Sequence, residues 1–298
     1  MIRALILACA LAGPAHAFEL EGQSGTVTLP AAPQSVAVLS WGLAEVAADL
    51  DLPLTGVADT AGYATWVEAP ALPDDVRDLG LRNEPNLEAL SELAPDLVLG
   101  TDQQRDMADR LGQIAPTVIM EHFSADQSNA EAARQTYRDI AAAFGKSDLA
   151  ERRLSEIDAA MTAAGDRVRA AWGDKVPPVL PVRLLTPTTV RIHGPNSMAE
   201  AALEGMGLTP AAGGAPTDWG FILAPIEVLA EYEDAAIVHI DPFPEKEALF
   251  ASPLWEAIPA VSEGRFAVAA PAWTFGNVVS LQVLADRMAD ALVEIAPE

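Results

Sequence analysis

Cysteine is nearly absent from this chain, and basic residues are scarce. The only cysteine among the 298 residues is Cys9, which lies in an apolar segment close to the N-terminus. Beyond that segment there is no thiol, which excludes disulfide bonds and cysteine nucleophiles. Lys and Arg number 18 against 43 Asp and Glu, so the formal net charge is −25. A negative field of this size disfavours binding to nucleic acid and to anionic lipid.

The motifs of the common enzyme classes are missing as well. The sequence has no GxGxxG after a strand, no P-loop lysine motif, no GxSxG and no HExxH. Beyond the N-terminal segment the sequence has three isolated histidines, His122, His193 and His239. A metal site would need them brought together with a carboxylate such as Asp241. Lone histidines near strand ends are usually structural, so we predict no protein-bound metal. A secreted α/β enzyme is kept as a distant alternative.

The first 17 residues have the pattern of a cleavable secretion signal. Arg3 precedes an apolar run from Ala4 to Ala12, and Ala15-His16-Ala17 gives the small-residue cleavage pattern. This run is too short for a permanent anchor, and no later run approaches the roughly 20 residues that a membrane helix needs. Lipidation of Cys9 is the weaker alternative, because it would leave a very short leader. We expect the mature chain to begin near Phe18, outside the cytoplasm.

One long helical pattern divides the remaining chain into two similar halves. Ser147 offers an N-cap, and apolar or small residues recur at helical spacing from Leu154 to Trp172. Strands alternate with helices on both sides of this segment, which predicts two α/β lobes with mainly parallel sheets joined by one rigid helix. We therefore divide the chain into a signal (1–17), an N-terminal lobe (18–146), a linker helix (147–172) and a C-terminal lobe (173–298).

Aromatic residues gather in loops of both halves. Trp66, Trp219 and Trp273 lie between the predicted regular elements, as do Tyr63 and Phe275. Any one of them could simply cover its own lobe. Loops at sheet ends carry binding sites more often than cores do, and the cleft between two lobes is the usual functional site. We expect these aromatic side chains to line an inter-lobe pocket.

Three charged residues stand out near these loops and in the repeated halves. Arg82 could present the planar donor fork of its guanidinium to an oxygen-rich ligand, or could pair with Glu84 at the surface. Glu88 and Glu227 hold equivalent places in the two halves, each in the first turn of a predicted helix. These acids either interact with the helix dipole or dock the lobes onto a basic partner.

Several sequence blocks together carry a family resemblance. The blocks are GVADTAGYATWVEAPALP, DLGLRNEPNLEALSELAPDLVL, GPNSM, SPLWEAIPAVSEGRF and PAWTFG. In order and spacing the chain resembles the periplasmic iron-siderophore-binding proteins of ABC importers, and most closely the ferric-hydroxamate binders. The resemblance implies the class III binding-protein fold, with two α/β lobes joined by one long helix, a shallow cleft and little hinge closure.

The resemblance also implies roles for individual residues. Arg82 is similar to the arginine that donates hydrogen bonds to the iron-bound hydroxamate oxygens. Trp66, Trp219 and Trp273 are similar to the aromatic walls of the pocket, and Trp41 and Phe275 to positions at its edge. By the same resemblance, Glu88 and Glu227 correspond to acids that dock the lobes onto the permease.

One departure concerns the segment after the DLVL strand. The hydroxamate binders place a tyrosine there as a second donor to the ligand, whereas this chain has Gly100-Thr101-Asp102-Gln103-Gln104. Either another polar group replaces the tyrosine or the ligand differs.

The sequence therefore predicts a non-catalytic, monomeric periplasmic carrier. It would capture a ferric siderophore, of the hydroxamate type, and deliver it to an inner-membrane ABC permease. Iron would be held by the oxygens of the siderophore, so no cofactor is expected. The alternative cargoes are a catecholate chelate, a haem or a corrinoid. A single arginine in a strongly negative field compensates poorly for the higher charge of a catecholate complex.

Overall fold

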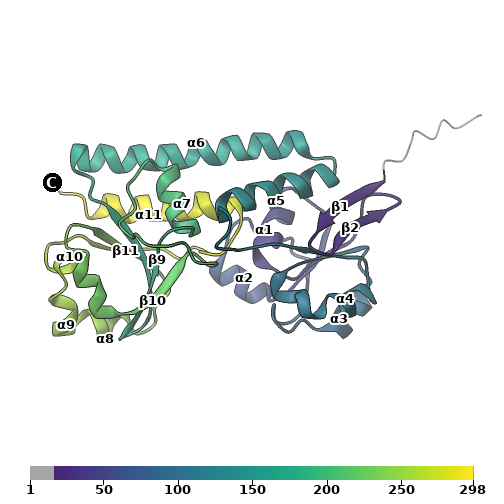
Figure 1. Cartoon of the computed structure of the whole chain (residues 1–298), viewed down its shortest axis with the longest axis horizontal. Coiled ribbons are helices and arrows are strands. Elements are labelled where there is room, and N and C mark those ends of the chain that lie inside the picture. The colour runs from purple at the N-terminus through teal and green to yellow at the C-terminus, as the bar shows by residue number, and fades with distance from the viewer. Residues whose placement is uncertain (1–16, 298) are drawn as a thin grey trace, which may run out of the picture.

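Two α/β lobes lie side by side in the computed structural model, which describes residues 17–297, and one long helix runs along both lobes (Figure 1). This arrangement confirms the fold class predicted from the sequence. Residues 1–16 of the predicted secretion signal lie outside the described residues. Within residues 17–297, no helix is long and apolar enough to cross a membrane.

The N-terminal lobe is built on a five-stranded sheet in which every pair of neighbouring strands is parallel. The strand order is β5-β4-β3-β6-β7, and the central strands are buried and rich in Val and Leu, as is typical of parallel strands covered by helices. A separate antiparallel hairpin precedes the sheet. The elements of this lobe are β1 (Phe18–Gly22), β2 (Gly25–Leu29), β3 (Val36–Val38), α1 (Trp41–Asp49), β4 (Leu54–Val57), α2 (Thr60–Trp66), β5 (Arg77–Asp78), α3 (Leu87–Leu93), β6 (Leu97–Thr101), the 3₁₀ helix η1 (Asp102–Met107), α4 (Ala108–Gly112), β7 (Thr117–Met120) and α5 (Asn129–Ala143).

The C-terminal lobe has a mixed sheet of five strands in the order β10-β9-β8-β11-β12. Its first three strands are antiparallel to one another, and the others are parallel. Only two residues connect β8 to β9, which is too short for the crossover that a parallel pair needs. The elements are η2 (Gly173–Lys175), β8 (Val179–Thr186), β9 (Thr189–His193), α7 (Met198–Gly205), β10 (Phe221–Pro225), η3 (Ile226–Glu231), β11 (Ala236–Ile240), α8 (Lys246–Phe250), α9 (Pro253–Glu256), α10 (Pro259–Ser262), β12 (Phe266–Ala269) and α11 (Val278–Glu294).

The long helix α6 (Ser147–Trp172) packs its apolar stripe on α11 and on α5 and α7. Leu154, Ile157 and Val168 are fully buried in this contact, and burial of each such side chain contributes about 1.5 to 3 kcal/mol. The helix begins where the sequence predicts, but Ser147 is its first residue and not its N-cap. Gly145 ends α5 with a φ of +66°, and the tight turn leaves Lys146 in the cap position without a side-chain cap.

Hydrogen bonds join the lobes close to the cleft. The buried Glu45 carboxylate, on α1, accepts from the Asn277 N–H (3.2 Å) and from both the N–H (2.8 Å) and the hydroxyl (2.6 Å) of Ser280 at the start of α11. A second link joins the start of α5 to the loop before α7, where the Asn129 N–H donates to Asn196 Oδ1 at 2.8 Å. The two lobes are therefore tied by specific contacts in addition to α6.

Candidate functional site

A cavity of about 270 Å³ opens between the lobes and is lined by residues of both. Four of its residues, Ser40, Arg82, Gln103 and His122, follow strands of the parallel N-terminal sheet. The carboxyl ends of parallel strands meet at one edge of a sheet, and ligands of open α/β folds bind there. The full lining is Ser40, Trp41, Arg82, Gln103, His122, Arg191, Trp219, Phe221, Trp273 and Phe275.

Arg82 packs against the aromatic wall of this cavity. Its guanidinium carbon is 3.7 Å from the centre of the Trp41 ring and 5.3 Å from that of Trp273, distances that favour cation–π attraction. Burial lowers the pKa of Arg82, against the smaller opposing effect of Asp59, but an arginine so shifted still carries its charge. No ion pair between described residues involves Arg82, so its N–H donors are available to a ligand.

Buried polar groups fix the position of Arg82. The side-chain amide of Gln104, which is completely buried, donates to the Arg82 carbonyl oxygen at 2.7 Å. Thr101 and Gln104 also cap η1 reciprocally. The segment that lacks the expected tyrosine therefore supports the Arg82 loop through Gln104 and places its neighbour Gln103 at the cavity.

The aromatic wall is continuous from one lobe to the other. Ring centres are separated by 4.8 Å for Trp41 and Trp273, 5.4 Å for Trp273 and Phe275, and 5.5 Å for Phe275 and Trp219. The Trp41 indole N–H donates to the carbonyl oxygens of Ala58 (3.2 Å) and Asp59 (3.1 Å), which fixes this ring in the N-terminal lobe. The wall offers a rigid apolar surface beside the Arg82 donors.

His122 and Arg191 add polar groups to the cavity from opposite lobes. Burial, with a smaller effect of the Arg82 charge, lowers the pKa of His122 to about 3, so its imidazole is neutral at ordinary pH. The Arg191 guanidinium lies 4.4 Å from the ring centre of Phe221 and 5.1 Å from that of Phe275. Both residues are half-buried. The cavity thus combines an arginine on each wall with one neutral imidazole.

Residues 36–272 match the family described as periplasmic binding protein. The chain belongs to the periplasmic binding protein family. It is 32% identical over 250 residues to the iron(3+)-hydroxamate-binding protein FhuD of Escherichia coli, covering 83% of each chain. It is also 27% identical over 292 residues to the ferric-anguibactin-binding protein FatB of Vibrio anguillarum, covering 90% of this chain and 85% of that protein.

Solved structures of the periplasmic binding protein family share the fold. The siderophore-binding protein FhuD of Vibrio cholerae, solved with Fe3+-Desferal bound, superimposes with a TM-score of 0.86 at 33% identity. The match covers 88% of this chain and 99% of that one. The relatives named here are, by their names, binding proteins for complexes of ferric iron.

Five of the seven predicted ligand-binding residues line the cavity, and the other two do not. Those on the cavity are Arg82, Trp41, Trp219, Trp273 and Phe275. Trp66 does not line the cavity, but its ring centre lies 6.3 Å from that of Trp273 and 5.2 Å from the Arg183 guanidinium carbon. Tyr63 does not line the cavity, because α2 turns it into the core, where it is 1% exposed and its hydroxyl donates to Pro70 O at 2.8 Å.

Sequence reasoning missed Ser40, Gln103, His122, Arg191 and Phe221 as lining residues. Ser40 and His122 follow buried strands, which is a signal that could have been used. Arg191 stands between the buried Val190 and Ile192 of β9, so strand alternation turns it to the other face of the sheet. No signal in the sequence shows which of its neighbours that face meets.

The structure does not bring the three histidines together as a metal site. Among residues 17–297, no three His, Cys, Asp or Glu side chains are grouped so that they could hold a metal ion. His239 is fully buried in the C-terminal lobe, where its Nδ1 accepts from the Leu184 N–H at 3.3 Å. His193 is also buried, behind the Phe221 and Phe275 rings.

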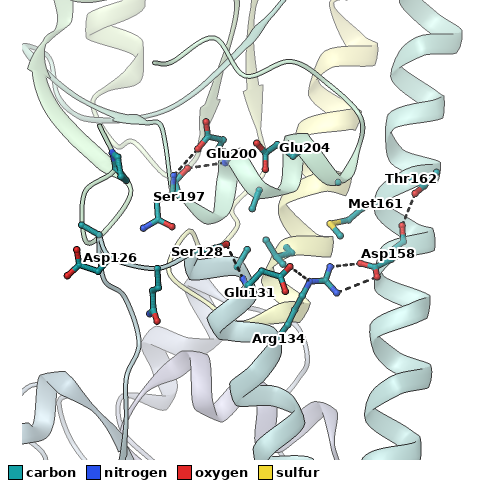
Figure 2. A pocket seen from close by; sticks show the side chains of 18 residues that line it. Asp126, Ser128, Glu131, Arg134, Asp158, Met161, Thr162, Ser197, Glu200 and Glu204 are labelled. Atoms are coloured by element: carbon teal, nitrogen blue, oxygen red, sulfur yellow. Dashed lines mark hydrogen bonds and ion pairs between the residues drawn. The ribbon is translucent and has the colours of Figure 1, made fainter. Parts of the chain in front are cut away.

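A larger cavity, of about 720 Å³, lies beside α5, α6 and α7 (Figure 2). The charged residues of its lining are five acids and Arg134, and the lining includes no aromatic residue. As Figure 2 shows, Arg134 pairs with Asp158 and Glu131, and Ser197 caps the helix of Glu200. The only basic group of this lining is thus paired with its own acids, so the smaller aromatic cavity is the candidate ligand site.

Glu88 and Glu227, the two predicted docking acids, are both exposed. Glu88 lies in the first turn of α3, which Asn86 caps, and Glu227 lies in the first turn of η3. In Figure 1, α3 lies on the side of its lobe away from α6, as does β10, which leads into η3. Neither acid belongs to the cavity lining.

Proposed function

We propose that this chain is a periplasmic carrier that binds a ferric siderophore of the hydroxamate type in the inter-lobe cavity and delivers it to an ABC permease. Membership of the family and the named ligands of FhuD from Escherichia coli and Vibrio cholerae support this cargo. The observation that carries the proposal is Arg82, which packs on Trp41, has no carboxylate partner among residues 17–297, and lines a cavity walled by aromatic rings.

The geometry suits an iron chelate. The oxygens that bind iron in a hydroxamate carry negative charge, and a guanidinium donates charge-assisted hydrogen bonds to such oxygens. Trp41, Trp219 and Trp273 provide apolar area for the carbon arms of the siderophore. A cavity of about 270 Å³ is at the small end of ligand pockets, which fits a chelate that is only partly enclosed.

In this proposal the iron is cargo and the protein supplies no ligand to it. The carrier has no catalytic role and works as a monomer that is exported by the N-terminal signal. Glu88 and Glu227 would present one acid from each lobe to basic residues of the permease.

The test is a titration of the mature protein with ferric hydroxamates, a ferric catecholate, haem and cobalamin. Tryptophan fluorescence reports binding because Trp41, Trp219 and Trp273 line the cavity, and calorimetry gives the affinity. We expect saturable quenching by ferric hydroxamates. A response to haem or cobalamin alone would contradict the proposed cargo.

The first variant is Arg82→Ala. Loss of hydrogen bonds from a charged donor costs about 1.5 to 3 kcal/mol, so we expect binding of a ferric hydroxamate to weaken about 10- to 100-fold. Arg105→Gln is the matched control, because this exposed arginine is bonded to Gln23 outside the cavity. If Arg82→Ala binds every ferric hydroxamate as tightly as wild type, the central contact of the proposal is wrong.

A further inference from the structure

Two arginines face each other on neighbouring strands of the C-terminal lobe. Arg183 on β8 pairs directly with Arg191 on the antiparallel strand β9, so both side chains stand on the same face of the sheet. Arg183 is 4% exposed and donates to the Ala272 carbonyl oxygen at 2.9 Å, and Arg191 is half-buried. Like charges placed directly opposite each other on a sheet destabilise it, and burial adds to that cost.

No carboxylate among residues 17–297 forms an ion pair with either arginine. Neither arginine takes part in an ion pair within the described chain, and the Nε of each has no hydrogen-bond partner there. Asp241 attracts Arg183 electrostatically, but its close partners are Lys246 (2.9 Å) and His239 (3.2 Å). Within the described chain the pair is offset by ring contacts, of Arg183 with Trp66 at 5.2 Å and of Arg191 with Phe221 at 4.4 Å, and not by an opposite charge. A local arrangement that costs stability is a common property of functional sites.

Arg191 of this pair reaches the ligand cavity. It lines the cavity beside Phe221 and Phe275, on the wall contributed by the C-terminal lobe, whereas Arg82 belongs to the wall of the N-terminal lobe. The cavity therefore holds a guanidinium on each side, although the chain as a whole has a net charge of −25. In so negative a protein, an anionic ligand needs local cations of this kind.

We infer that Arg191 is a specificity-determining residue that binds a free carboxylate of the siderophore. This inference rests on the proposed function and narrows its substrate class: the cargo is a ferric hydroxamate that also carries carboxylate, so that the complex is a net anion. Arg82 meets the iron-bound oxygens and Arg191 meets the carboxylate, whose two oxygens match the guanidinium fork. Arg183, opposite Arg191 on the neighbouring strand, raises the positive potential at the same place.

The test compares two chelates and four proteins by calorimetry. The anionic probe is the ferric complex of aerobactin, a citrate-based dihydroxamate with free carboxylates, and the neutral probe is ferrichrome, a trihydroxamate. The proteins are wild type, Arg191→Met, Arg191→Lys and the control Arg105→Gln, which removes one charge outside the cavity. Methionine keeps an unbranched side chain over Phe221 but removes the charge and the donors.

We expect Arg191→Met to weaken binding of ferric aerobactin about 10- to 100-fold and to change binding of ferrichrome less than about threefold. Arg191→Lys keeps the charge without the fork and should give an intermediate loss, and Arg105→Gln should match wild type. The unfolding temperature of ligand-free Arg191→Met should equal or exceed that of wild type, because the substitution removes the repulsion from Arg183.

Equal losses for both chelates, or no loss for ferric aerobactin, would overturn the role of Arg191 and leave the carrier function standing. A wild-type protein that binds neither chelate would overturn the proposed function, and this inference with it. An unfolding temperature well below that of wild type would show that Arg191 is structural.

Discussion

At the scale of single residues, the cleft depends on side chains that are fixed before any ligand arrives. Trp41 is held by two hydrogen bonds to backbone carbonyls, and Arg82 lies on its ring with a backbone that Gln104 positions. Side chains that are already ordered lose little conformational entropy on binding. A small cavity built from such side chains can therefore bind a ligand at a low entropic cost.

Glu45 is the residue whose titration should be visible in the stability of the protein. Burial raises the pKa of this carboxyl from 4.5 to about 7, against the opposing effect of its hydrogen bonds from Ser280 and Asn277. The folded state therefore holds a proton between pH 4.5 and 7 that the unfolded state has released. The stabilisation from this group is complete below pH 4.5 and is lost as the pH rises to about 7, a change of about 3 kcal/mol.

Chemical denaturation at a series of pH values tests this prediction with two variants. Glu45→Gln removes the titrating group, so the free energy of unfolding should depend less on pH between 4.5 and 7. Ser280→Ala removes a hydrogen bond that lowers the pKa of Glu45, so the loss of stability should extend to higher pH. A profile of Glu45→Gln parallel to that of wild type would contradict the assignment.

At the scale of elements, α6 depends on one close approach to α7. A Cβ placed on Gly165 would lie 1.8 Å from the carbonyl oxygen of Met206, at the end of α7. The Arg169 guanidinium donates to the same oxygen at 2.8 Å. Glycine is thus required where the helix that joins the lobes meets the end of α7.

Gly165→Ala should therefore destabilise the protein, although alanine usually favours a helix. The added methyl group forces the backbones apart, and overpacking of this kind costs about 1 to 3 kcal/mol. Gly112→Ala on α4 is the control, because nothing lies within 4 Å of its Cβ, and it should leave stability unchanged or raise it slightly. Urea denaturation of the two variants, compared with wild type, checks both expectations.

The same elements show how far the sequence could predict the structure. The 3.6-residue pattern of α6 and the alternation of strands and helices depend on local periodicity, which can be read directly. The antiparallel pairing of β8 with β9 follows from the two residues that connect them, but the register that sets Arg183 opposite Arg191 is not visible in the local periodicity. Tyr63 and Trp66 looked alike in the sequence, but α2 turns Tyr63 fully into the core and leaves Trp66 partly exposed.

At the scale of the whole molecule, the lobes are restrained on several sides. Besides α6, Glu45 ties α1 to the start of α11, and Asn129 is bonded to Asn196 and to the carbonyl oxygen of Asp218. These contacts oppose wide opening of the lobes. A permease must then recognise the loaded carrier from the surfaces that both lobes present, more than from a large domain closure.

Glu88 and Glu227 are the acids that we expect such a permease to contact, and charge reversal tests them. Glu88→Arg and Glu227→Arg should leave chelate affinity unchanged, because neither residue lines the cavity. Each should reduce uptake into vesicles that contain the cognate permease by at least about tenfold at limiting carrier, because like charges at an interface are strongly unfavourable.

Glu21→Arg on β1 is the control, since this acid is also exposed and lies on the hairpin, away from α3 and η3. If the two acids serve only the helix dipoles, the variants should lower the unfolding temperature and transport at the wild-type rate, and the docking role would be wrong.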